Sequence, residues 1–214
     1  MKILALEFSS PQRSVAVATG LSFFEVIEVA VRHTAALGMM TKVLSDARLE
    51  REQIECLAVG FGPGSYHGIR AAIALAQGWQ LANGVKLLGI SSTEVIAAQA
   101  QADGFSGTAS VVADAQRNEF YLARYEINPA ICRETEPLRI ATLVEMQARE
   151  AAGEVLIGPE VTRWFASGKI IFPSAATLAR LAAARSDFVA GEKLEPIYLR
   201  ETAFVKAPPL RVIV

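Results

Sequence analysis

Histidine and cysteine are scarce in this chain, since each occurs only twice in 214 residues. His33 and His67 are far apart in the sequence, and neither has a second histidine one helical turn away, so no cluster of three or more metal ligands is indicated. Cys56 and Cys132 form no Cys-x-x-Cys motif, which favours two reduced thiols. The sequence therefore predicts no bound metal and no metallopeptidase, and it offers no Ser-His-Asp or Cys-His pattern for nucleophilic catalysis.

The chain also lacks an excess of charge and an apolar run of membrane length. Its formal net charge is −1, which is a poor basis for binding RNA unaided. The longest uncharged apolar stretch, 71–85, contains Gln77, Gln80 and Asn83, and it is too short and too polar to span a bilayer. The first residues lack the long apolar region of a signal peptide. We therefore expect a cytoplasmic protein that contacts no membrane and meets tRNA only through other proteins.

Apolar residues are abundant instead, and their order predicts an α/β fold built from two units that begin alike. The first unit has predicted strands at Lys2–Ser9, Ser14–Thr19, Phe23–Val31, Ile54–Phe61 and Val85–Ile90, and helices at Ala35–Arg48, Tyr66–Ala82 and from Ser91 or Ser92 to Ala102. The second has predicted strands at Thr108–Asp114, Glu119–Ile127 and Val155–Gly158, and helices at Thr142–Ala151 and near Pro159 and Ala175. The loop-like stretch 103–107 separates two predicted domains, 1–106 and 107–214.

Two helices of the first unit have more apolar surface than one sheet face can cover. The helix 66–82 is apolar on nearly all sides, and such a helix must be covered on both. We therefore predict that the two helices form a partner-binding face, through which the chain forms a two-fold homodimer when it is alone. Its predicted residues are Ala36, Leu37, Met39, Met40, Val43, Leu44, Ala71, Ala72, Leu75 and Trp79. The alternative is that both helices are ordinary core elements of a monomer.

The segment Gly62-Pro63-Gly64-Ser65 joins a predicted strand to a helix N-terminus, where free N–H groups and the helix dipole can bind an anion. It is not a Walker loop, because no Gly-Lys-Ser/Thr follows. The alternative is a rigid turn in which Ser65 caps the helix. Both interpretations remain open at this point.

Four segments in this order resemble the TsaB/YeaZ family, whose relatives carry the older label of glycoprotease or M22-type peptidase. They are residues 3–17, 58–70, 112–121 and 195–200. The resemblance implies two actin-like lobes of the ribonuclease H-like type, each a mixed sheet with helices. It also implies a non-catalytic subunit, not an enzyme by itself, that supports the catalytic subunit TsaD together with the ATPase TsaE in threonylcarbamoylation of tRNA adenosine.

The same resemblance marks candidate nucleotide-binding residues, although the chain departs from the family at several of them. In the actin-like fold, a hairpin turn holds phosphates and an acid on the first strand orients metal and water. Glu7 occupies the acid's position, where the family usually has Asp, and the candidates in the second unit are Asp114 and Glu119. Pro11 in the first turn has no N–H to donate. We therefore expect no resident cofactor and at most weak ATP or ADP binding, at the interface of the complex.

Further departures are Tyr66-His67, where the family usually has Phe-Thr, and the stretch 116–119, where it usually has Arg-x-Gly-Glu. The alternative functions are a stand-alone ATP-dependent kinase or hydrolase of the actin-like fold and, third, a peptidase of the M22 type. A strong magnesium-dependent nucleotide signal would favour the kinase or hydrolase.

Overall fold

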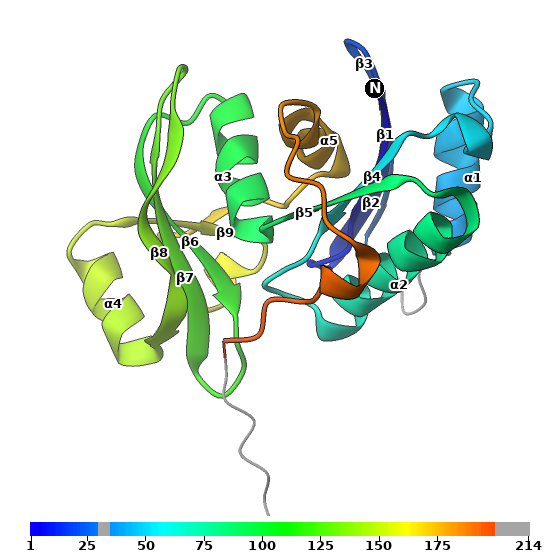
Figure 1. Ribbon diagram of the computed structural model, residues 1–214. Helices are drawn as coiled ribbons and strands as arrows, with labels where there is room; N and C mark the ends of the chain where they lie inside the picture. Colours follow the sequence, from blue (N-terminus) through cyan, green and yellow to red (C-terminus); the bar gives the residue numbers. More distant parts are fainter. Residues whose placement is uncertain (30–34, 200–214) are drawn as a thin grey trace, which may run out of the picture.

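The computed structural model describes residues 1–29 and 35–199, which form two lobes around two five-stranded sheets (Figure 1). The first sheet has the order β3-β2-β1-β4-β5. Strands β1 to β3 form an antiparallel meander, and β4 and β5 extend the sheet in parallel with β1. Their bounds are Lys2–Glu7, Gln12–Thr19, Ser22–Val29, Cys56–Gly60 and Lys86–Ile90.

The second sheet repeats this topology with the order β10-β9-β6-β7-β8. Its central strand β6 pairs antiparallel with β7 and parallel with β9, as β1 does with β2 and β4. The bounds are Gly107–Asp114 for β6, Glu119–Ile127 for β7, Cys132–Thr142 for β8, Val155–Gly158 for β9 and Lys169–Ile170 for β10. The repeated order confirms the predicted α/β fold of two similar lobes, each a mixed sheet with helices.

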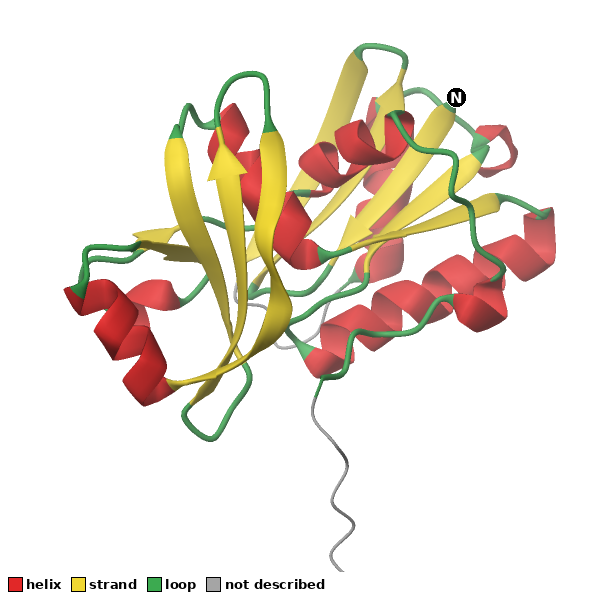
Figure 2. Ribbon diagram, turned by 60° about the vertical axis from the view of Figure 1, so that its left-hand side comes forward, coloured by secondary structure: helices red, strands yellow, loops and turns green. Residues whose placement is uncertain are grey.

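Helices cover both faces of each sheet, and two of them lie between the sheets (Figures 1 and 2). Helices α1 (Ala36–Asp46) and α2 (Tyr66–Asn83) pack on the outer face of the first sheet through one apolar cluster. Helix α4 (Leu143–Ala151) lies on the outer face of the second. Helices α3 (Ser92–Ala102) and α5 (Ala175–Ala183) fill the space between the two sheets.

The two inner helices are exchanged between the lobes. Helix α3, which follows the first sheet in the chain, packs on the second through Ile96, Ala97 and Ala100. Helix α5, which follows the second sheet, packs on the first, where Leu178 and its neighbours contact the small side chains of β1 and β2. The prediction that 107–214 forms one domain is therefore wrong for α5, because the inner face of the first sheet needs its apolar stripe as a cover.

The segment after α5 also stays on the first lobe. Val189 forms an isolated bridge to Leu87 of β5, and Leu194 is buried in the cluster under α2. Gln77 of α2 donates a hydrogen bond to the carbonyl of Gly191 at 2.8 Å. The segment predicted to be a helix near Pro159 forms only a single 3-10 turn, Val161–Arg163; two more such turns lie at Arg51–Gln53 and Gly191–Lys193.

Candidate functional site

The predicted partner-binding face on α1 and α2 is partly wrong. The predicted residues Met39, Met40, Val43, Leu44 and Ala72 are all buried in the core of the first lobe. They contact the outer face of the first sheet. In each helix, the apolar residues that repeat with the helical period face this sheet. These five side chains cannot contact a partner directly.

A different stripe of α2 is exposed and consists of small or apolar residues. Ala71, Ala74, Gly78 and Leu81 follow one another at intervals of three or four, which places them on one side of the helix. Leu81 is 89% exposed, and Leu37 on α1 is 64% exposed. We call these five residues the α1–α2 surface. Sequence reasoning included Leu37 and Ala71 and missed the other three, although their helical spacing is visible in the sequence.

Gly78 is the unusual member of the α1–α2 surface. A Cβ added to Gly78 would meet no atom within 4 Å, so nothing within the described chain requires a glycine there. In the interior of an exposed helix, glycine costs about 1 kcal/mol relative to alanine. The remaining predicted residues of this face, Ala36, Leu75 and Trp79, are half-buried against the core at its border.

Glu7, the predicted acid of the first lobe, ends β1 and is fully buried, with an exposed fraction of 0%. Its carboxyl oxygens accept hydrogen bonds from the backbone N–H of Ser9 at 2.9 Å and from the hydroxyl of Ser92 at 3.2 Å. Burial raises the pKa of the Glu7 carboxyl, and the hydrogen bonds from the two serines offset this only in part. Gly60 on β4 makes room for the carboxylate, because a Cβ there would lie 1.9 Å from its Oε2.

The loop 62–65 packs directly against the backbone that follows Glu7. The N–H of Ser65 donates to the carbonyl of Ser9 at 2.7 Å, and a Cβ on Gly64 would lie 2.1 Å from that oxygen. The hydroxyl of Ser65 accepts from the N–H of Gly68 at 3.4 Å and so caps α2. The glycine is therefore required by contact between two backbones, and the side of the loop that faces Ser9 has no space for an anion.

Asp114 has the same place in the second lobe that Glu7 has in the first. It ends β6, and its carboxylate accepts hydrogen bonds from the backbone N–H of Gln116 at 2.7 Å and from the side-chain amide of Gln116 at 2.9 Å. Glu119 begins β7, and its backbone closes this hairpin, because its N–H donates to the carbonyl of Gln116 at 3.2 Å. The carboxylates of Glu7 and Asp114 thus each order the turn that follows a central strand.

Tyr66 and Tyr198 form an exposed aromatic pair near the same loop. Their ring centroids are 5.6 Å apart, and Arg70 donates a hydrogen bond to the Tyr66 hydroxyl at 3.1 Å. The segment that carries Tyr198 is anchored by Ile197, whose N–H donates to the carbonyl of Phe61 at 3.0 Å. The segment 58–70 of the family resemblance therefore lies beside residues 197 and 198 of its last segment.

Within the described residues, no group of three or more His, Cys, Asp or Glu side chains is placed to hold a metal ion. His67 lies on the surface beside Tyr66. His33 lies outside the described residues. No helix of the described part of the chain has the length and apolar character needed to cross a membrane.

The burial of Glu7 has a consequence for the pH dependence of folding. Above the ordinary carboxyl pKa near 4.5, the unfolded chain ionises Glu7 while the folded chain retains the proton, so the free energy of unfolding falls as pH rises toward the raised pKa. Glu7→Gln removes this pH-dependent loss of stability, and the glutamine side chain can still form hydrogen bonds with Ser9 and Ser92. In urea unfolding, we expect the stability of Glu7→Gln relative to the native chain to increase as the pH rises above about 4.5. The exposed Glu52→Gln is the control, and equal slopes for the two variants would contradict the prediction.

Comparison with known proteins places this architecture in a family. The family model described as TsaD, tRNA N6-adenosine threonylcarbamoyltransferase, matches residues 28–197. A protein of Escherichia coli described as tRNA threonylcarbamoyladenosine biosynthesis protein TsaB is 28% identical over 98% of this chain and 99% of its own length. A protein of Buchnera aphidicola with the same description is 27% identical over 81% of this chain and 89% of its own length.

Solved structures agree with the observed fold. A Pseudomonas aeruginosa protein with similarity to peptidase YeaZ superposes with a TM-score of 0.80 at 25% identity, over 93% of this chain and 99% of that chain. A structure of YeaZ from Pseudomonas aeruginosa gives a TM-score of 0.79 at 23% identity, over 92% of this chain and 99% of that chain. The likeness therefore extends over nearly the whole of this chain.

Proposed function

Because this chain belongs to the family of TsaD, tRNA N6-adenosine threonylcarbamoyltransferase, and within it to the TsaB/YeaZ group, we propose that it is the non-catalytic subunit of a tRNA-modifying complex. Members of this group are named for tRNA threonylcarbamoyladenosine biosynthesis. In the proposed role the chain binds and supports the catalytic subunit TsaD, the ATPase TsaE joins them, and tRNA meets the chain only as part of this cytoplasmic complex.

The observation that carries the proposal is the α1–α2 surface. An exposed helical stripe of Ala71, Ala74 and Gly78 lets a second helix approach closely, at the near end of the usual 8–10 Å between helix axes. Leu37 and Leu81 supply the large apolar side chains that a partner would bury. A helix packed against this stripe would offset the cost of glycine in the middle of α2.

A non-catalytic role agrees with the hydrogen bonds that Glu7 and Asp114 form. Glu7 and Asp114, which the family resemblance marked as candidates for nucleotide chemistry, each bind the turn beside them. Glu7 has no exposed surface from which to contact a ligand. We infer at most weak ATP or ADP binding to this chain, at the boundary with the catalytic subunit, and no resident cofactor.

The test is co-expression of the chain with TsaD and TsaE of its own organism. We expect a tagged chain to retain TsaD through purification, and the reconstituted mixture to form threonylcarbamoyladenosine on tRNA. Omitting this chain should remove most of the product, and the chain alone should form none. Product formed by the isolated chain, or TsaD recovered only at background level, would contradict the proposal.

The second candidate, a stand-alone ATP-dependent kinase or hydrolase, rests on the actin-like fold alone. Titration of the isolated chain with Mg-ATP in a calorimeter distinguishes the two. A micromolar dissociation constant without partners would favour the kinase or hydrolase. In the absence of TsaD we expect the α1–α2 surface to join two copies into a two-fold dimer, which sedimentation at several concentrations can detect.

A further inference from the structure

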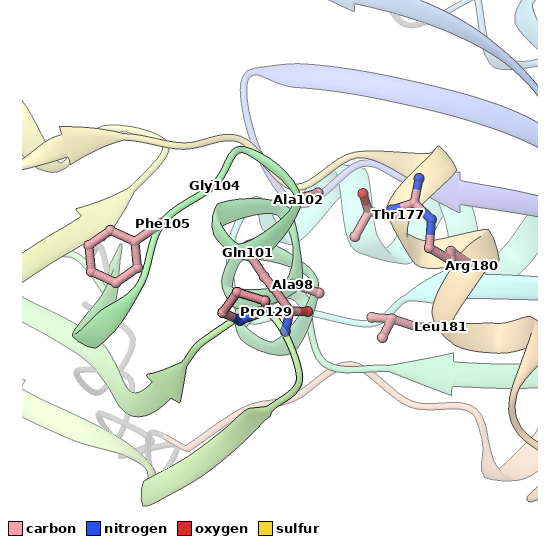
Figure 3. A pocket seen from close by; sticks show the side chains of 9 residues that line it. All are labelled: Ala98, Gln101, Ala102, Gly104, Phe105, Pro129, Thr177, Arg180 and Leu181. Carbon is pink, nitrogen blue, oxygen red and sulfur yellow. The ribbon is translucent and has the colours of Figure 1, made fainter.

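A cavity of about 500 Å³ lies where α3 and α5 meet, away from the residues discussed above (Figure 3). Its walls come from α3 and the turn that follows it, from the turn between β7 and β8, and from α5. The volume lies within the roughly 300–1,000 Å³ of small-molecule sites. Much of the wall is apolar, with Ala98, Phe105, Pro129 and Leu181 among the lining residues.

The polar side chains of the lining differ in the hydrogen bonds and ion pairs that they already form within the protein. The Gln101 side-chain amide donates to the carbonyl of Asn128 at 2.5 Å, and the Thr177 hydroxyl donates to the side chain of Gln99 at 2.5 Å. Arg180 is the one charged residue of the lining, and it forms no ion pair with another described residue. Its guanidinium group lies over the ring of Phe23, 5.3 Å from the ring centroid.

The one charged side chain of the lining, that of Arg180, favours an anion. Lys169, which is not part of the lining, places its ammonium group over the ring of Phe105 at 5.4 Å. Two carboxylates outside the lining already accept hydrogen bonds from neutral groups. Asp103 accepts a hydrogen bond from Gln99 at 2.9 Å, and Glu25 accepts one from the N–H of Ala176 at 3.1 Å. Arginine binds carboxylates through two parallel hydrogen bonds, and its stem and plane tolerate apolar neighbours.

We propose that this cavity binds a small organic acid with an apolar body of about the size of one aromatic ring. Its carboxylate pairs with the guanidinium group of Arg180. Its body lies against the apolar wall formed by Ala98, Pro129 and Leu181. Since α3 packs on the second sheet and α5 on the first, the bound acid contacts elements that belong to both lobes.

The experiment titrates the full, isotope-labelled chain with benzoate and follows backbone amide shifts by NMR. Benzamide, which has nearly the same shape without the charge, serves as the matched probe. We expect saturable benzoate shifts confined to α3, α5 and the β7–β8 turn, with benzamide binding at least about tenfold more weakly, as expected for the loss of one charge-assisted pair. The test does not depend on the tRNA-modifying function proposed above.

Two variants locate the binding. Arg180→Gln is expected to weaken benzoate binding by at least about tenfold, and Ala102→Leu, at an exposed position of the lining, should weaken it by filling the cavity. Arg163→Gln is the control, because Arg163 also lies over an aromatic ring, that of Trp164 at 4.9 Å, outside the cavity. Unchanged affinity in both cavity variants, or no saturable shifts in the native chain, would overturn the proposal. Tighter binding of phenyl phosphate than of benzoate would contradict the choice of a carboxylate.

Discussion

Replacing Gly78 by glutamate is expected to leave the chain folded and to weaken its binding to TsaD by about 100-fold, since a charge left buried and unpaired in an interface costs about 2–5 kcal/mol. Gly78 lies on the exposed stripe of α2, and its Cβ position is empty. Glutamate is a better helix former than glycine, so the isolated monomer should gain about 0.5 kcal/mol of stability. Loss of binding would then not reflect loss of folding. Surface-immobilised TsaD and urea unfolding measure the two effects separately.

Two further variants make this result specific to the surface. Ala148→Glu adds the same charge to an exposed position of α4 on the second lobe and should change neither affinity nor assembly. Gly78→Ala should stabilise the monomer by about 1 kcal/mol while weakening TsaD binding less than glutamate does. If Gly78→Glu binds TsaD as tightly as the native chain, the interface lies elsewhere on the molecule.

Most helices and strands of the first lobe could be predicted from the sequence because their local signals agree with their packing. Helix α2 begins at Tyr66 as predicted, since Ser65 supplies the cap, and it ends one residue later than predicted, before the left-handed Gly84. Strand β8 was missed for the opposite reason. It is an edge strand of charged residues with Pro137 in its middle and irregular pairing to β7, and it shows no alternation of apolar and polar residues.

The candidate site was harder to predict, because periodicity shows that a stripe is apolar without showing what covers it. Met39 and Met40 belong to an apolar helical stripe of the kind that can form a contact surface. The first sheet covers this stripe. Gly78 has little hydrophobicity, yet it is the residue whose presence the isolated chain does not explain. Glu7 was correctly placed on the first strand, which was predicted to run on to Ser9, but its burial depends on Gly60, a neighbour more than 50 positions away in the sequence.

Gly60→Ala is the second substitution for which we expect a large effect, this time on folding. The added methyl group would lie 1.9 Å from Oε2 of Glu7, whose side chain is fully buried. Overpacking of this kind costs about 3 kcal/mol. For a chain of this size, the melting temperature should fall by about 6–12 °C. Gly38→Ala is the control, since a Cβ on Gly38 makes only an ordinary contact with Ala35 at 3.6 Å.

A double mutant tests whether the overlap with Glu7 is the cause. Glu7→Asp shortens the side chain by one methylene group and should by itself cost about 1 kcal/mol. Combined with Gly60→Ala, it withdraws the carboxylate from the new methyl group, so the two changes should cost about 1–2 kcal/mol less together than the sum of their separate costs. Chemical unfolding of the four proteins in the cycle measures this coupling. Strictly additive costs would show that Gly60 is required by the strand backbone itself and not by the buried carboxylate beside it.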